Sequence, residues 1–206
     1  MAKLGHQVIG IEQDQAKLES LKEGKIPFHE PGLDKALTEV LATDLLTFQS
    51  SHNEQSQAAD LHFICVGTPQ KDSGEADTSY VVSAAKELAK NLRHESVVVG
   101  KSTVPVGTAR ELKNLMSDLA GFEVHLAWNP EFLREGTALE DSLKPDRIVV
   151  GAWDDYAVEK VKEVYKPILE TGTPFLSLDV ETAELVKVAA NAFLAAASSA
   201  SGAFEA

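Results

Sequence analysis

The chain has 206 residues, of which 44% are hydrophobic and 25% are charged, values typical of a folded globular protein. Its net charge of −13 argues against nucleic acid as a partner, because nucleic-acid-binding proteins neutralise phosphates with clustered Lys and Arg. No apolar stretch approaches the roughly 20 residues that span a membrane, and segment 1–6 has no apolar signal region. We therefore expect a cytoplasmic protein without a membrane partner.

The single cysteine, Cys65, excludes an internal disulfide and a cysteine-rich metal site, and we expect no metal site at all. Cys65 lies within the apolar run 61–66. This position favours a buried structural thiol over a reactive one.

Short β-branched runs alternate with longer helical patterns along the chain. We expect strands over residues 7–12, 46–49, 61–66, 96–101, 123–127, 147–151 and 175–178. We expect helices over residues 15–23, 32–42, 78–92, 108–119 and 156–169, and a last one from about residue 180. This alternation predicts an α/β fold with a doubly wound, Rossmann-like, mostly parallel sheet. Residues 195–206 lose the helical pattern and indicate an irregular end.

The strand over 7–12 ends in Glu12, which is the first candidate ligand-binding residue. In dinucleotide-binding sheets, an acidic residue at the end of the second strand accepts hydrogen bonds from ribose hydroxyls and repels the extra phosphate of NADP. A solvated loop glutamate explains Glu12 equally well. The Gly-x-Gly-x-x-Gly turn belongs roughly twenty residues before the acidic residue, but only eleven residues precede Glu12. We therefore expect the chain to begin inside the first helix, without the first strand.

Two loops follow buried strands and are candidates for a ligand crevice, because ligands bind at the carboxyl ends of parallel strands. The first is Val66–Pro69, where a simple turn is an equally good explanation. The second is Lys101–Thr108, in which Gly107 or Thr108 would cap the following helix. A cap at Gly107 or Thr108 does not explain why the hydroxyl residues Ser102 and Thr103 stand at the start of this loop. Their hydroxyls could hydrogen-bond a ligand or a catalytic water.

The segment Asn129–Ala138 predicts a helix start, with Asn129 as N-cap and Pro130 as the first helical residue. Glu131 and Glu135 would then lie on one helical face. Two carboxylates held close together could supply a general base. Alternatively, Glu131 only complements the helix dipole.

A helical stretch from Ala183 to Leu194 carries Lys187 and Asn191 four residues apart on one face, among small and apolar residues. A Lys and an Asn in that setting are costly unless they meet a partner or a ligand. The alternative is a Lys that reaches solvent from the edge of the helix.

These segments, in this order, resemble the UDP-glucose/GDP-mannose dehydrogenase family. The resemblance covers residues 1 to about 194, and the Ser102–Thr108 segment is similar to the UDP-glucose branch. The matching landmarks are Glu30-Pro31-Gly32-Leu33, Val66–Pro69, Lys101–Thr108, Asn129–Gly136, Pro145-Asp146-Arg147-Ile148-Val149 and Ala183–Leu194.

The resemblance implies oxidation of the carbon-six alcohol of a UDP-hexose, UDP-glucose to UDP-glucuronate, with reduction of two NAD. In this family a cysteine captures the aldehyde as a thiohemiacetal, which is oxidised to a thioester and hydrolysed. By position, Lys187 would stabilise negative charge on the reacting oxygen, and Asn191 and Thr103 would orient that oxygen or a water. Glu131 would be the general base for hydrolysis, and Glu135 would contact NAD.

The residue roles that the resemblance implies fall into three sets. The catalytic set is Thr103, Glu131, Lys187 and Asn191. The cofactor-binding set is Glu12, Lys17, Val66, Gly67, Thr68, Pro69, Ser102, Thr103 and Glu135. The substrate-binding set is Glu131, Phe132, Leu133, Arg134, Glu135, Lys187 and Asn191. The implied domains are an incomplete NAD-binding domain over 1–179 and the start of a central dimerisation helix over 180–206.

The chain departs from the family at both ends. It lacks the central first strand with its glycine loop, so the neighbouring strands would have unpaired edges and the chain would be poorly stable. It also stops before the homo-oligomerising region and the nucleophilic cysteine, for which Cys65 cannot substitute. We expect the chain alone not to complete the oxidation.

Two other functions remain open from the sequence. One is a noncatalytic remnant or weak nucleotide-binding module. The other is a β-hydroxyacid dehydrogenase of the 6-phosphogluconate type, against which the Asn129–Gly136 segment argues.

Overall fold

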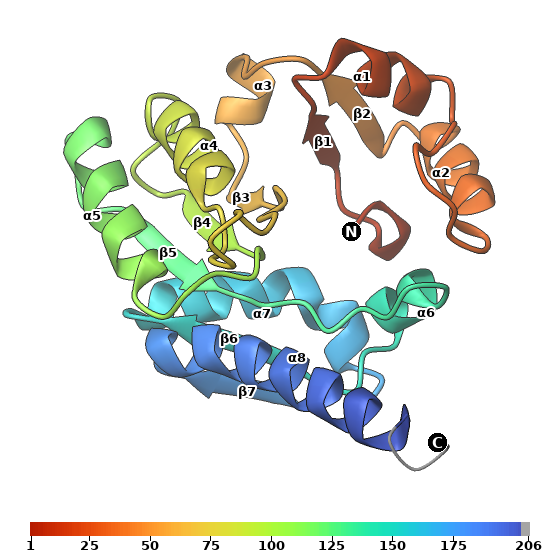
Figure 1. The fold of residues 1–206 in the computed structure, drawn as a ribbon. Coiled ribbons are helices and arrows are strands. Elements are labelled where there is room, and N and C mark those ends of the chain that lie inside the picture. Colours follow the sequence, from red (N-terminus) through yellow and green to blue (C-terminus); the bar gives the residue numbers. More distant parts are fainter. Residues whose placement is uncertain (203–206) are drawn as a thin grey trace. The chain divides into compact units, whose positions relative to one another are not determined.

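The computed structural model describes residues 1–202, and the side chains of residues 1–197 (Figure 1). The chain forms two compact units. The first unit comprises Met1–Ala59, Phe132–Ile148 and Val161–Pro174. The second unit comprises Asp60–Glu131, Val149–Lys160 and the residues from Phe175 onward.

The first unit is built on two parallel strands, β1 (Val8–Ile11) and β2 (Leu46–Gln49), with Val8 opposite Leu46. Its helices are η1 (Ala2–Leu4), α1 (Gln15–Lys22), α2 (Leu33–Leu41), α3 (Glu54–Gln57) and α6 (Ala138–Leu143). Local sequence sets the start of α1, because the Asp14 side chain accepts a hydrogen bond from the Lys17 amide. Leu18 of α1 and Leu37 and Val40 of α2 are buried in the core of this unit.

The second unit contains a five-stranded sheet in the order β3-β4-β5-β6-β7. Its strands are β3 (Leu61–Ile64), β4 (Val97–Gly100), β5 (His125–Trp128), β6 (Ile148–Ala152) and β7 (Phe175–Leu178). Strands β3, β4 and β5 are parallel, whereas β6 is antiparallel to β5. The helices are α4 (Ser79–Ala89), α5 (Thr108–Ala120), α7 (Asp155–Leu169) and α8 (Val180–Gly202), and the residues of α7 divide between the two units.

The centre of the second unit is the strand β4. Val97, Val98 and Val99 are fully buried, as expected for an apolar run covered on both faces. Gly100 ends the strand against the ring of the buried Trp128, which leaves no room for a side chain at this position. Helices α4 and α5 pack side by side (Figure 1).

The α/β, mostly parallel fold expected from the sequence is confirmed, and each predicted strand is present with its ends shifted by no more than about two residues. The strands form two separate sheets. Within residues 1–202, β1 pairs only with β2, and β3 pairs only with β4. No helix within that part is both long and apolar enough to cross a membrane.

Three local predictions were wrong. No helix starts at Asn129: residues 129–134 are irregular and α6 begins only at Ala138, so Glu131 and Glu135 do not share a helical face. The helix α8 continues to Gly202 because Ala and Ser are compatible with helix, whereas residues 203–206 lie outside the described residues. Cys65 is exposed, since β3 ends at Ile64 and the apolar run continues into a loop.

Candidate functional site

In the second unit, the candidate residues gather on loops at one edge of the sheet. The carboxyl ends of the parallel strands β3, β4 and β5 point to the same edge. The Ser102 hydroxyl, buried after β4, donates to the Val66 carbonyl at 2.6 Å. The Thr68 hydroxyl donates in the opposite direction, to the Thr103 carbonyl at 2.8 Å. The loops after β3 and β4 are therefore hydrogen-bonded to each other.

The loop after β5 is fastened to β4 through Lys101 and Asn129. The Lys101 ammonium donates to the Asn129 side-chain oxygen at 3.0 Å, and the Asn129 amide donates to the Val149 carbonyl of β6 at 2.8 Å. Asn129 is 2% exposed. Its side chain is thus committed to tertiary contacts, which explains why it does not cap a helix.

Two of the predicted catalytic residues contact each other. Lys187, on α8, forms an ion pair with Glu131, with Nζ and Oε1 3.1 Å apart. The Lys187 side chain is 9% exposed and that of Glu131 is 31% exposed, so the carboxylate reaches solvent while the ammonium is nearly buried. Asn191, one turn further along α8, is exposed. Lys187 therefore does not extend into solvent, in contrast to the alternative considered from the sequence.

Glu184 is a functional candidate that the sequence analysis missed. It is 1% exposed, and its carboxylate accepts hydrogen bonds from the Gly107 and Ala109 amides, both at 2.7 Å. Burial raises the pKa of the Glu184 carboxyl, and the bonds from the two amides oppose that rise. Its spacing of three residues from Lys187 on α8 was a sequence signal for a shared face.

In the first unit, Glu12 directly follows β1 and is half-buried. One of its carboxylate oxygens accepts from the Asp14 amide at 2.9 Å. The Lys17 side chain, on the first turn of α1, is exposed. A carboxylate after β1 fits two ribose hydroxyls and disfavours a 2′-phosphate, so the residues present fit the ribose of NAD. The sequence contains no Gly-x-Gly-x-x-Gly turn to bind its pyrophosphate.

The remaining predicted residues, Phe132–Glu135, also belong to the first unit. The Arg147 guanidinium lies 4.8 Å from the centre of the Phe132 ring, a cation–π contact. Leu133 and Glu135 are exposed. Arg134 is bound to Asp141 of α6 by its side chain and its backbone amide, so its guanidinium is already paired within the unit.

The Arg134–Asp141 pair predicts a specific pH dependence of stability. Arg134 lowers the pKa of Asp141 from 3.8 to about 2. A depressed pKa in the folded state means that the ionised carboxylate stabilises the fold above pH 3.8, and that this contribution is lost as the pH falls through about 2. In urea unfolding followed by circular dichroism, the stability difference between wild type and Asp141→Asn should be constant above about pH 4 and vanish towards pH 2. The exposed Asp118 supplies the control, Asp118→Asn, and a difference that does not change with pH would contradict the prediction.

Glu30 fastens the segment before α6 to the rest of the first unit. It is 6% exposed, and its two oxygens accept from the Gly136 amide at 3.0 Å and the Ala138 amide at 2.8 Å. The landmark Glu30-Pro31-Gly32-Leu33 thereby acquires a physical role, because the carboxylate satisfies amides at the start of α6 that have no helical partner.

We expect Glu30→Gln to destabilise the first unit by about 1–3 kcal/mol, because an amide side chain has one acceptor oxygen where the carboxylate has two. The measurement is urea unfolding followed by circular dichroism. Glu140→Gln, an exposed change on α6, is the matched control. Equal midpoints for the two variants would show that the contact contributes nothing.

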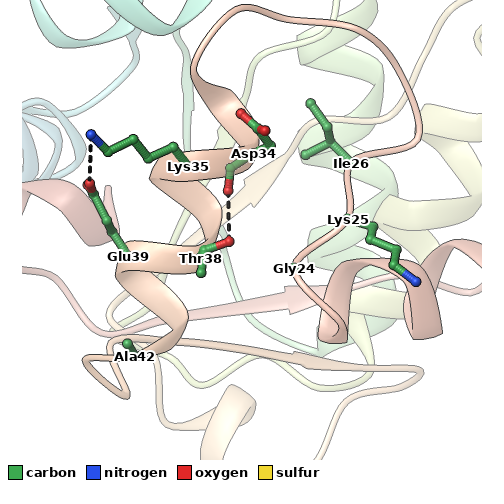
Figure 2. Close-up of a pocket in the computed structure, with 8 residues that line it drawn as sticks. All are labelled: Gly24, Lys25, Ile26, Asp34, Lys35, Thr38, Glu39 and Ala42. Carbon is green, nitrogen blue, oxygen red and sulfur yellow. Dashed lines mark hydrogen bonds and ion pairs between the residues drawn. The ribbon is translucent and has the colours of Figure 1, made fainter.

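The first unit also has an open pocket of about 680 Å³ between the end of α1 and the helix α2 (Figure 2). Figure 2 shows the Thr38 hydroxyl directed to the Asp34 carbonyl and Lys35 directed to Glu39. None of the residues predicted from the sequence lines this pocket.

Comparison with known proteins identifies the family of this chain. Residues 1–169 match the model of the UDP-glucose/GDP-mannose dehydrogenase family, NAD binding domain. The chain belongs to this family. UDP-glucose 6-dehydrogenase of Rhizobium meliloti is 44% identical over 198 residues, which cover 94% of this chain and 45% of that protein. The family assignment also identifies NAD as the cofactor of this domain.

Solved structures of family members have the same fold. UDP-glucose dehydrogenase from Pyrobaculum islandicum aligns with a TM-score of 0.88 at 42% identity, over 94% of this chain and 45% of that one. GDP-mannose dehydrogenase from Pseudomonas aeruginosa aligns with a TM-score of 0.88 at 32% identity, over 95% of this chain and 46% of that one. The chain therefore spans less than half the length of the family members that it matches.

Proposed function

We propose that this chain is the NAD-binding part of an enzyme that oxidises UDP-glucose to UDP-glucuronate. The observation that carries the proposal is the contact between Lys187 and Glu131, next to β5 at the loop edge of the sheet. A nearly buried ammonium suits an oxygen that acquires negative charge, and a solvent-reaching carboxylate suits removal of a proton from water. The 44% identity to a UDP-glucose 6-dehydrogenase supports the choice of sugar nucleotide.

In this proposal the chain's residues divide the work between binding and proton transfer. Glu12 and Lys17 hold the adenosine ribose and pyrophosphate, while Glu135 and the loops Val66–Pro69 and Ser102–Thr103 contact the rest of the cofactor. The cofactor would supply the hydride acceptor for both oxidations, one NAD for the alcohol and a second NAD for the thiohemiacetal. Lys187 would stabilise negative charge on the carbon-six oxygen, and Thr103 and Asn191 would orient that oxygen or a water. Glu131 would take a proton from the water that hydrolyses the thioester formed in this family.

The substrate lies, in this proposal, against the segment that follows Glu131. Phe132, Leu133 and Arg134 would contact the sugar nucleotide, with Glu131 and Lys187 at the reacting carbon. The backbone of Phe132 and Leu133 would make this contact, and Leu133 is exposed. We place the incomplete NAD-binding domain at residues 1–179 and the start of the central dimerisation helix at residue 180; residues 203–206 lie outside the described residues.

The same proposal assigns self-association to the helix α8. Its apolar residues Leu185, Val188, Phe193 and Leu194 are exposed in this chain. Exposed apolar side chains on one helix are typical of a surface that another chain covers. The partner in the proposal is a second copy of the same protein.

Calorimetric titration with NAD and NADP tests the cofactor part of the proposal on this chain. We expect NAD to bind more tightly than NADP, and Glu12→Ala to weaken NAD binding roughly tenfold through loss of a charged acceptor. Glu19→Ala, an exposed carboxylate on α1, is the matched control. Absence of NAD binding would leave the chain a noncatalytic remnant.

The substrate part is tested on the complete gene product, by the absorbance of NADH formed from UDP-glucose, GDP-mannose and 6-phosphogluconate. Formation of two NADH per UDP-glucose supports the proposal. Preference for either other substrate would contradict it.

A further inference from the structure

The first three turns of α8 contact three different parts of the second unit. At the start, Val180 and Ala183 pack on Gly151 of β6 so closely that an added methyl group would lie 2.7 Å from the Val180 Cα atom. Next, the Glu184 carboxylate meets the amino end of α5. One turn later, Lys187 meets Glu131 after β5. The position of Lys187 along α8 is therefore fixed by contacts that precede it.

Glu184 replaces a cap that the local sequence of α5 lacks. The N-cap of α5 is Gly107, which adopts a φ of 97° and has no side chain with which to accept hydrogen bonds. The first amides of a helix have no partner within it and need an acceptor. Glu184 supplies one for both Gly107 and Ala109, from 77 and 75 residues further along the chain.

The same contact fixes the end of the loop that contains Thr103. The loop Lys101–Gly107 is held at its start by the bonds of Ser102 and Thr68 to the neighbouring loop. Glu184 holds its other end. Because Glu184 and Lys187 are three residues apart, roughly 4.5 Å along a helix axis, one rigid turn of α8 determines where the loop ends and where the ammonium lies.

We infer that Glu184 is a positioning residue, which holds the Lys101–Gly107 loop and Lys187 in a fixed relation through the amino end of α5. The functional meaning of this inference rests on the proposed function, in which Thr103 and Lys187 act on the same oxygen. A carboxylate is required because it accepts from two amides at once, whereas an amide side chain has one acceptor oxygen.

The test compares Glu184→Gln with Glu181→Gln in the same chain. Glu181 lies on the first turn of α8 and pairs with Arg110 at the surface, so it is a matched loss of charge. We expect the Gly107 and Ala109 amides to exchange hydrogen at least about tenfold faster in Glu184→Gln, as loss of a charged hydrogen bond implies. We expect Lys187 to be acetylated severalfold faster than in wild type, relative to the exposed Lys86. Glu181→Gln should change neither rate.

A general loss of stability would accelerate exchange everywhere, including at Val98 and Val99 of the central strand. Unchanged exchange in β4 with faster exchange at Gly107 and Ala109 supports a local positioning role. Unchanged exchange at the two amides, or unchanged acetylation of Lys187, overturns the inference. If Glu184→Gln does not fold, the same measurements are made on Glu184→Asp. Its shorter side chain should weaken the hydrogen bonds to the Gly107 and Ala109 amides and so raise their exchange rates.

The two proposals fail separately. Exchange and acetylation are measured without any ligand, so they test the positioning role of Glu184 whether or not NAD binds. A wild-type chain that does not bind NAD overturns the proposed function alone.

Discussion

Lys187→Met should lower kcat for NADH formation from UDP-glucose by about 10²–10³-fold, the usual effect of removing a preorganised donor to a developing oxyanion. The ammonium is nearly buried, and charge interactions are stronger where water is excluded. Met keeps much of the volume of the Lys stem, and the partly exposed Glu131 remains hydrated after its partner is lost. The measurement is steady-state kinetics of the complete gene product.

The matched control for this experiment is Lys166→Met. Lys166 lies on α7 in the first unit and has an i,i+4 ion pair with Glu170 at the surface, so the change removes a paired ammonium that is not among the predicted site residues. Its kcat should equal that of wild type. A Lys187→Met enzyme with wild-type kcat would remove Lys187 from the mechanism, and circular dichroism of the variant checks that it is folded.

Gly151→Ala should destabilise the second unit by about 3 kcal/mol, at the upper end of the usual cost of overpacking. The added methyl group would lie 2.7 Å from the Val180 Cα atom and 2.8 Å from the Asp179 carbonyl oxygen. Both are backbone atoms at the start of α8, so no side-chain rotation relieves the overlap. The helix must move away from β6, and Glu184 and Lys187 must move with it.

Urea unfolding followed by tryptophan fluorescence measures this effect, because both tryptophans, Trp128 and Trp153, belong to the second unit. Gly67→Ala is the matched control, since a methyl group at Gly67 meets nothing within 4 Å and no positive φ opposes it. A midpoint for Gly151→Ala equal to that of Gly67→Ala would show that α8 does not pack on β6 as described.

The fold was predictable because its signals are local. The run Val97-Val98-Val99 is buried on both faces, and the strand predicted over residues 96–101 is present over Val97–Gly100. The start of α1 was also predicted at residue 15, where the structure shows the Asp14 side chain as a cap. Periodicity and capping act within one or two turns, and a single sequence contains that information.

The site was only partly predictable because its contacts are distant in sequence. Lys187 and Glu131 were each recognised as candidates, but their contact joins residues that no local pattern relates. Glu184 was missed because its partners are backbone amides, which have no signature in the sequence. Asn129 was misread as a cap because its side chain forms bonds with Lys101 and β6 that compete with capping.

The contact of Glu30 with Gly136 and Ala138 also bears on how the protein is made. The first unit draws its residues from three stretches, the last of which ends at Pro174. Residues 1–59 therefore leave the ribosome long before their partners, by on the order of 10 s at common synthesis rates. During that interval the Glu30 carboxylate lacks the Gly136 and Ala138 amides, and the His6 ring lacks the Val164 carbonyl. Molecular chaperones that bind nascent chains would meet this part of the unit before the stretches that complete it.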